Sequence, residues 1–424
     1  MKKILITLTV LVAIGKTNAQ ETIYPATAQS GNIVLTHATI HIGSGQVLQD
    51  AMILIRDGKI VSVGPTEPVK DNAKIIDCTG KQIYPGLISP VTDLGLSELS
   101  AVRSTNDEYE LGNINPNIRS VIAYNSDSKV IDILRSNGVL LANVIPQGGI
   151  ISGASSVVQL DAWNWEDAAY QTDGGIHFNM PYLERFSTEG DDPLKSGMDK
   201  IEDVRNFLRQ AKAYLDETKH EHTNLKFEAV KGLFNKTQLF FVHCELVKEM
   251  MIAVEFAKEF GFKTVIVGGT DSYKITDYLK QNNIAVILNE MNSLPALQDD
   301  DVDMPYKTPY LLQQAGVMYC ISDPNQSSRF RNLGFNAGIA AGHGLTKEQA
   351  LQAITLNTAK ILGIGDRTGS LETGKDANII VSDGDILDIK TNNVVYAFIQ
   401  GRQINLDNKQ KQLYEKYKYK YNLK

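Results

Sequence analysis

Three titratable side chains stand just after apolar runs that are typical of buried strands. His243 closes the run 239–243, Asp323 follows the run 316–321, and Asp93 follows the run that begins at Leu87. Imidazole and carboxylate groups can hold a divalent metal or accept a proton. Each has a structural alternative: a hydrogen-bonded core histidine, a turn residue before proline for Asp323, and a loop carboxylate bound to backbone amides for Asp93.

Glu245 is a fourth candidate, because it follows His243 by two residues and would share its direction if the strand continued. It can equally begin the next helix, where a carboxylate is favourable. The other histidines have no such placement. His220 and His222 form a His-x-His pair, but they lie in a polar, charged segment and we interpret them as solvated. No glycine-rich stretch continues into the Gly-Lys-Ser/Thr of a phosphate loop.

Composition limits the class of protein. The chain has 424 residues, 43% hydrophobic and 21% charged, which is ordinary for a globular protein of one large and one small domain. A net charge of −7 argues against general nucleic-acid binding. The three cysteines are far apart and have no CxxC spacing, so we expect small buried apolar residues rather than a disulfide framework.

Residues 1–19 have the pattern of a secretory signal peptide. Lys2 and Lys3 precede an apolar run, and small residues end at Ala19. The run is shorter than the roughly 20 apolar residues that a membrane span needs. We therefore expect export to the periplasm or the medium, with no stable membrane anchor.

Regular structure must position these side chains. Residues 32–84 read as short strands with turns, including an Asp57-Gly58 hairpin, and a similar texture returns at 377–403. Pairing between the two ends would form one small β domain around the middle. That middle alternates apolar strands at 239–243, 263–267, 284–288 and 316–321 with helical patterns, as in parallel βα units.

Three further stretches complete the chain, two of them predicted helices. Residues 346–362 read as one helix, capped by Thr346 and stopped by Gly363. The polar segment 161–235 reads as an elaborated connection that could cover a barrel mouth. The tail 409–424 is rich in lysine and tyrosine and predicts a surface helix.

Several motifs together resemble one family. The stretch 350–363, ALQAITLNTAKILG, and the following 369–381, GSLETGKDANIIV, are similar to the C-terminal segments of the amidohydrolase superfamily. Tyr84-Pro85-Gly86-Leu87-Ile88 resembles the segment that ends the first barrel strand there. The chain looks like the imidazolonepropionase-like branch of that superfamily.

The resemblance implies a fold. It is a distorted (β/α)8, TIM-like barrel at 85–365, with a small β-sandwich domain built from 20–84 and 366–408. The signal peptide at 1–19 and the basic C-terminal helix at 409–424 are predicted from the residues themselves. In such barrels the chemistry lies at the C-terminal ends of the strands.

The resemblance also shows what the site has lost. The two first-strand histidines of the family correspond to Val91 and Asp93, and the sixth-strand histidine corresponds to Gly268. The fifth-strand histidine matches His243 and the eighth-strand aspartate matches Asp323, while no lysine is found for the fourth strand. The implied metal site is His243, Asp93 and Asp323, with Asp323 as the catalytic base and zinc as the best-suited metal.

Two hypotheses follow. The first is an exported hydrolase that cleaves the C–N bond of an amide, imide or small peptide-like substrate with metal-activated water. The second is a non-catalytic homologue that keeps the barrel to bind a small molecule or to pair with an active paralogue. For partners we expect a small-molecule substrate or ligand, no nucleic acid, and a homo-oligomer or a paralogue.

Overall fold

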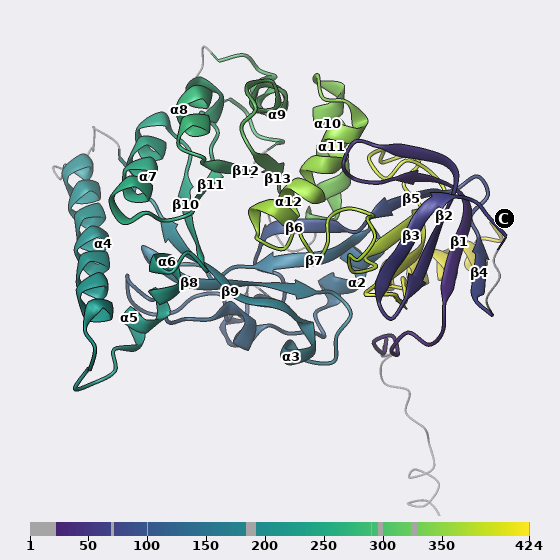
Figure 1. Ribbon diagram of the computed structural model, residues 1–424, viewed down its shortest axis with the longest axis horizontal. Coiled ribbons are helices and arrows are strands. Elements are labelled where there is room, and N and C mark those ends of the chain that lie inside the picture. Colours follow the sequence, from purple (N-terminus) through teal and green to yellow (C-terminus); the bar gives the residue numbers. More distant parts are fainter. Residues whose placement is uncertain are drawn as a thin grey trace, which may run out of the picture.

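The computed structural model describes residues 23–68, 72–99, 101–183, 192–289, 291–295, 300–323 and 329–423. The predicted signal peptide lies outside these residues. Two eight-stranded sheets organise the chain, and Figure 1 shows them side by side, one surrounded by helices and one at the other end of the molecule. The predicted fold class is confirmed: a distorted TIM-like barrel with a separate sheet domain.

The sheet domain joins both ends of the chain. Its strands have the order β16-β15-β14-β5-β1-β2-β3, and β4 pairs with β1. Their bounds are β1 Ile33–His41, β2 Val47–Arg56, β3 Lys59–Pro65, β4 Lys74–Asp77, β5 Gln82–Pro85, β14 Ile379–Ser382, β15 Val394–Ile399 and β16 Arg402–Gln403.

Antiparallel pairing of β14 with β5 is the link between the ends, with Ile380 opposite Tyr84. Alternate apolar side chains of these strands form a core of their own, which includes Ile40, Ile53 and Phe398. The hairpin expected at Asp57-Gly58 connects β2 to β3, and both residues have positive φ, as its tight turn requires.

The barrel sheet has the order β13-β12-β11-β10-β9-β8-β7-β6. Its strands are β6 Leu87–Thr92, β7 Val139–Val144, β8 Ile151–Gln159, β9 Ala169–Asn179, β10 Leu239–Cys244, β11 Thr264–Gly268, β12 Ala285–Leu288 and β13 Tyr319–Ile321.

One strand departs from the expected parallel order. β8 runs antiparallel to both β7 and β9. Only residues 145–150 connect β7 to β8, whereas a parallel crossover needs about a dozen residues or more. The segment expected to be an irregular connection, 161–235, contains β9 and so supplies the fourth barrel strand.

Helices cover the outside of the barrel (Figure 1). Those of the described chain are α2 Lys129–Arg135, α3 Trp165–Ala168, α4 Pro193–Asp216, α5 Leu225–Ala229, α6 Lys231–Phe234, α7 Val247–Phe260, α8 Thr276–Gln281, α9 Met304–Ala315, α10 Leu333–Gly342, α11 Lys347–Ala353, α12 Leu356–Ile361 and α13 Lys409–Lys420, with short 3-10 turns between some of them. Within the described ranges, none is both long and apolar enough to cross a membrane.

The single helix expected at 346–362 is interrupted. α11 ends at Ala353 and α12 begins at Leu356, because the chain turns at Ile354 to contact the barrel. Ile354 O accepts a hydrogen bond from Ile88 N of β6 (3.1 Å), and Asn357 Nδ2 donates to Tyr319 O of β13 (3.0 Å). This segment therefore joins the two end strands, which do not pair with each other.

A buried carboxylate joins the barrel to the sheet domain. Asp161, just after β8, is 1% exposed. Its Oδ1 accepts from Arg135 Nη1 of α2 (2.7 Å), and its Oδ2 accepts from Arg402 Nη1 of β16 (3.0 Å) and from Ala26 N (2.9 Å). Three separate segments thus converge on one side chain, whose negative charge balances the positive charges of both arginines.

Candidate functional site

Two histidines meet inside the barrel at the ends of neighbouring strands. His177 of β9 lies two residues before the in-register partner of His243 on β10. His177 Nδ1 and His243 Nε2 are 2.8 Å apart, and the His177 ring stacks on Phe241 with ring centroids 4.6 Å apart. His177 is fully buried, and its Nε2 has no hydrogen-bond partner among the described residues.

Burial keeps both rings neutral. It lowers the pKa of His243 to about 4, and it lowers the pKa of His177 well below 6.5, with a further contribution from His243. We assign the shared proton to His177 Nδ1, which donates to His243 Nε2, because this leaves an unpaired lone pair rather than an unpaired N–H at the buried His177 Nε2. The pair is therefore two neutral imidazoles held by one hydrogen bond.

The sixth-strand position is filled by a carboxylate from the fifth. Gly268 ends β11 with φ +105°, and a side-chain carbon there would overlap the Glu245 carboxylate. Glu245 Oε2 accepts from Thr270 N (3.0 Å) and Thr270 Oγ1 (2.6 Å). The two hydrogen bonds hold the carboxylate over Gly268, in the space that a histidine at that position would occupy.

The first-strand positions are also committed to other contacts. Val91 is 4% exposed and belongs to the apolar cluster that fills the barrel, together with Phe241 and Val267. Asp93 lies after β6, and in the part of the chain that the structure describes its buried Oδ1 finds no hydrogen-bond partner. Its carboxyl group lies near that of Glu108, from the loop that follows, and each influences the ionisation of the other.

Ionisation is disfavoured at both carboxyl groups. Burial raises the pKa of Asp93, and burial together with the nearby Asp93 charge raises the pKa of Glu108. Two nearby carboxyl groups in a partly desolvated site repel each other when both are ionised, so each makes proton loss from the other less favourable. A carboxyl group engaged in this way is a poor metal ligand, because binding requires the deprotonated form.

Asp323 lies two residues after the end of β13 and is partly buried. The residues after it, from Pro324 to Ser328, lie outside the described part of the chain. Ser322, just before it, is fully buried and its backbone N donates to Leu288 O of β12 (2.8 Å), which fixes where the strand ends.

The structure does not gather the three expected ligands. Among the residues that it describes, no three His, Cys, Asp or Glu side chains are placed so that they could hold one metal ion. His243 contacts His177, Asp93 contacts Glu108, and Asp323 stands on another strand. The side chains present in these positions therefore do not fit the metal centre that the resemblance implied.

Sequence reasoning missed three members of this site: His177, Glu108 and the role of Glu245 above Gly268. His177 was set aside because it has no metal spacing. A usable signal was present, since 176–179 alternates apolar and polar residues before a predicted strand at 239, and eight barrel strands require one there. Glu108 offered no local signal, because its contact with Asp93 spans a loop.

Two cavities lie at opposite ends of the barrel. One of about 360 Å3 is lined by Gly149, Asn179, Met180, Tyr182 and Lys200. Asn179 is the register partner of His243, so this cavity lies at the C-terminal end of β9, although neither histidine lines it.

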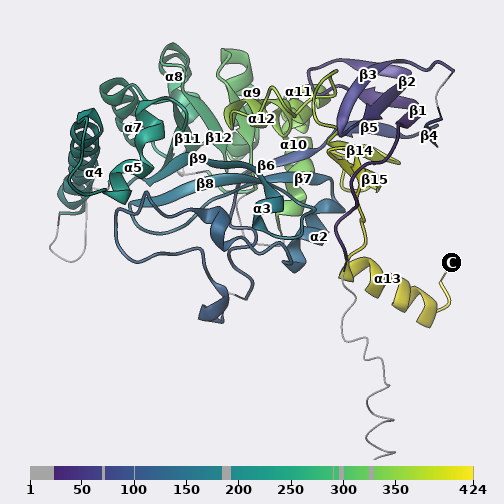
Figure 2. The same cartoon turned by 60° about the horizontal axis from the view of Figure 1, so that its bottom comes forward.

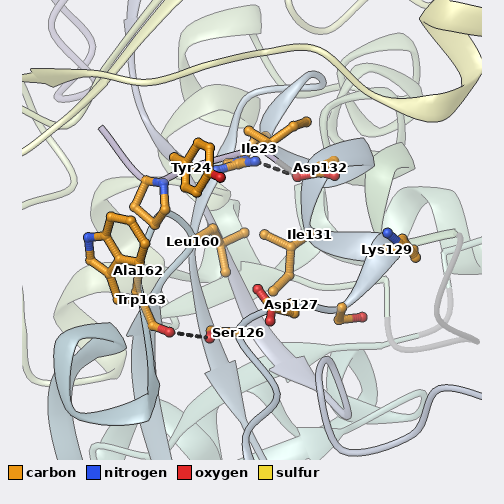
Figure 3. A pocket seen from close by; sticks show the side chains of 13 residues that line it. Ile23, Tyr24, Ser126, Asp127, Lys129, Ile131, Asp132, Leu160, Ala162 and Trp163 are labelled. Atoms are coloured by element: carbon orange, nitrogen blue, oxygen red, sulfur yellow. Dashed lines mark hydrogen bonds and ion pairs between the residues drawn. The ribbon is translucent and has the colours of Figure 1, made fainter. Parts of the chain in front are cut away.

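The other cavity, of about 370 Å3, is shown in Figure 3. Tyr24 and Trp163 form one wall, with ring centroids 6.0 Å apart, and Asp127 lies across from them. Leu160 in its lining follows the antiparallel β8, whose end lies beside the starts of the parallel strands. It therefore lies away from the end where barrel chemistry occurs.

Comparison with known proteins finds similarity to amidohydrolases and imidazolonepropionases. The profile of the Amidohydrolase family matches residues 317–404. The chain is 22% identical over 368 residues to the imidazolonepropionase of Staphylococcus aureus (strain MRSA252), covering 80% of this chain and 84% of that protein. It is 25% identical over 383 residues to the imidazolonepropionase of Streptococcus sanguinis (strain SK36), covering 81% and 86%.

A solved structure shares the fold over nearly its whole length. An amidohydrolase from Thermotoga maritima MSB8 superposes with a TM-score of 0.78 at 23% identity, covering 88% of this chain and 99% of that one. The family match at 317–404 covers the C-terminal motifs, and the superposition shows the same fold. Together these findings support the assignment of the chain to the amidohydrolase superfamily, in its imidazolonepropionase-like branch.

Proposed function

We propose that this chain is a non-catalytic member of a family of C–N hydrolases, one that keeps the barrel to bind a small molecule. Members of the family usually bind a divalent metal, and the positions that would hold it are occupied here by other contacts. The observation that carries the proposal is the Glu245 carboxylate above Gly268, held by Thr270. At this position the metal-binding side chain of the family is absent, and a hydrogen-bonded carboxylate lies where its first side-chain carbon would be.

Two further contacts support the same reading. Val91 packs in the barrel core, and the Asp93 carboxyl is paired with Glu108. To recruit Asp93 as a metal ligand, the chain would have to break that pair and ionise a carboxyl group whose pKa burial raises. The cavity beside Asn179 is the concave surface at this end of the barrel that suits a small ligand.

A second candidate is hydrolysis of the C–N bond of an amide, imide or small peptide-like substrate. The observation in its favour is that His243 is neutral, the form in which imidazole binds a metal, and that Asp323 stands at the end of the eighth strand. In this candidate a zinc ion held by His243, Asp93 and Asp323 would supply activated water, and Asp323 would accept its proton. It would require these side chains to come together, because the described residues form no group of three that could hold a metal ion.

Hydrolysis assays separate the two candidates. Wild type, His243→Ala and Asp323→Ala would be incubated with cyclic amides, cyclic imides, an imidazolone and N-acyl dipeptides, with and without added zinc or manganese. We expect the three proteins to give the same background rate with every substrate, because no assembled centre exists to be lost. Turnover by the wild type that disappears in both variants would establish the hydrolase instead. Far-ultraviolet circular dichroism would confirm that each variant is folded.

A further inference from the structure

The C-terminal helix α13 is fixed at its base. Asn408, its N-cap, is 4% exposed. Asn408 Oδ1 accepts from Lys411 N (2.9 Å), and Asn408 Nδ2 donates to Ser136 Oγ, just after α2 (2.8 Å). The helix therefore leaves the barrel in a direction set by a buried cap.

Beyond this cap, no side chain of α13 is buried against another described part of the protein. None of its residues is buried, and Figure 2 shows the helix extending away from the body of the molecule. Its tyrosines are largely exposed, 63% at Tyr414 and 87% at Tyr419. Stable helices in globular proteins usually bury an apolar face, so an ordered helix that buries none has a face available for a partner.

One face of the helix is aromatic. Leu413, Tyr417 and Tyr421 follow one another at intervals of four, and Tyr414 lies beside them. The rings of Tyr417 and Tyr421 stack with centroids 6.3 Å apart, which shows that they share this face.

Lysines border the aromatic face on both sides. Lys418 Nζ lies 6.0 Å from the Tyr414 ring centroid, and Lys420 Nζ lies 5.9 Å from that of Tyr417. At about 100° per residue, Lys418 falls on one side of the tyrosines, and Lys416 and Lys420 fall on the other. The result is a tyrosine stripe between two rows of ammonium groups.

Charge separates this helix from the rest of the protein. Residues 409–424 hold six lysines and one glutamate, a net charge of +5. The whole chain has a net charge of −7, so the residues before Lys409 carry −12. A cationic helix that projects from an anionic body presents its charge to an external surface.

We propose that α13 binds the anionic surface of a phospholipid membrane. Lysines that flank tyrosines suit the interface, where the ammonium groups meet lipid phosphates and the amphipathic rings lie among the headgroups. A protein partner is less well matched, because lysine is depleted at the centre of protein interfaces. The binding is peripheral: it rests on electrostatic attraction, with each lysine near an anionic surface strengthening it roughly fivefold.

Vesicle sedimentation tests the proposal. The protein beginning at Gln20 would be mixed with vesicles of phosphatidylglycerol and phosphatidylcholine in equal parts, or of phosphatidylcholine alone. We expect binding only to the anionic vesicles, weakened by added salt because screening shortens the reach of the charges. The triple variant Lys416→Gln, Lys418→Gln, Lys420→Gln should bind roughly a hundredfold more weakly.

A matched variant controls for total charge. Lys212→Gln, Lys231→Gln, Lys236→Gln removes three exposed lysines from α4 and the α6 region, and it should bind as wild type does. The proposal is overturned by equal binding of both triple variants, by equal binding to neutral vesicles, or by no binding at all. Light scattering that shows self-association dependent on Lys416, Lys418 and Lys420, without vesicle binding, would assign the helix to a second copy of the chain instead.

Discussion

Replacing Asp161 with alanine is expected to lower the free energy of unfolding by about 3–5 kcal/mol, the largest effect of a single substitution that we predict. The carboxylate is buried between Arg135 and Arg402 and also accepts from Ala26 N. Without it, the Arg402 guanidinium loses the carboxylate that it pairs with at the junction of the sheet domain and the barrel. Arg135 keeps its ion pair with Asp132. Burying an uncompensated guanidinium costs far more than losing one hydrogen bond.

Urea denaturation at neutral pH, followed by circular dichroism, measures this effect. Asp216→Ala is the matched control: its carboxylate pairs with Lys212 on the surface, with the two side chains 66% and 56% exposed, so its loss should change stability little. Equal midpoints for the Asp161 and Asp216 variants would show that the buried carboxylate does not hold the two parts of the chain together.

The second large effect is a loss of stability in mild acid. In the unfolded chain His243 takes up a proton near pH 6.5, whereas in the folded chain burial lowers its pKa to about 4. Between these values the unfolded state binds more protons, so stability falls as the pH falls, by about 3 kcal/mol for His243 alone. His177, whose pKa is lowered further, adds to the loss in the same direction.

The carboxyl pair acts in the opposite sense. The pKa of Asp93 and Glu108 is raised in the folded state, so protonation there favours folding as the pH falls. Comparing wild type with His243→Asn at each pH from 8 to 4, with a chelator present, removes this common contribution. We expect the stability difference between the two proteins to shrink, or to reverse, in acid. Parallel curves would mean that His243 is not buried as a neutral ring.

Much of the fold could be predicted from sequence because its signals are local. The Asp57-Gly58 turn, the apolar runs before His243 and Asp323, and the motifs at 350–363 and 369–381 each specify structure within a few residues. Pairing between the two ends of the chain was expected because both read as short strands with turns, and β14 does pair with β5. β9 was missed because its start, 171–175, is polar and glycine-rich, and only its neighbours β8 and β10 make it a strand.

Less of the site could be predicted from sequence, because its main contacts join segments that are far apart in the chain. Sequence showed that Val91 and Gly268 bind no metal, but not that Glu245 occupies the space above Gly268. It placed Asp93 and His243 at strand ends, whereas their partners, Glu108 and His177, come from a loop and a strand that carry no motif. Tertiary contacts of this kind leave no periodic pattern, although the strand that carries His177 does alternate apolar and polar residues at 176–179.

Metal content is the most direct measure of whether this barrel has replaced its metal centre with its own side chains. Protein without an affinity tag would be purified without chelator, incubated with zinc, manganese or iron(II), desalted, and analysed by inductively coupled plasma mass spectrometry beside His243→Ala. We predict far less than one metal per chain and no difference between the two proteins. One tightly held metal per wild-type chain, absent from His243→Ala, would contradict the account.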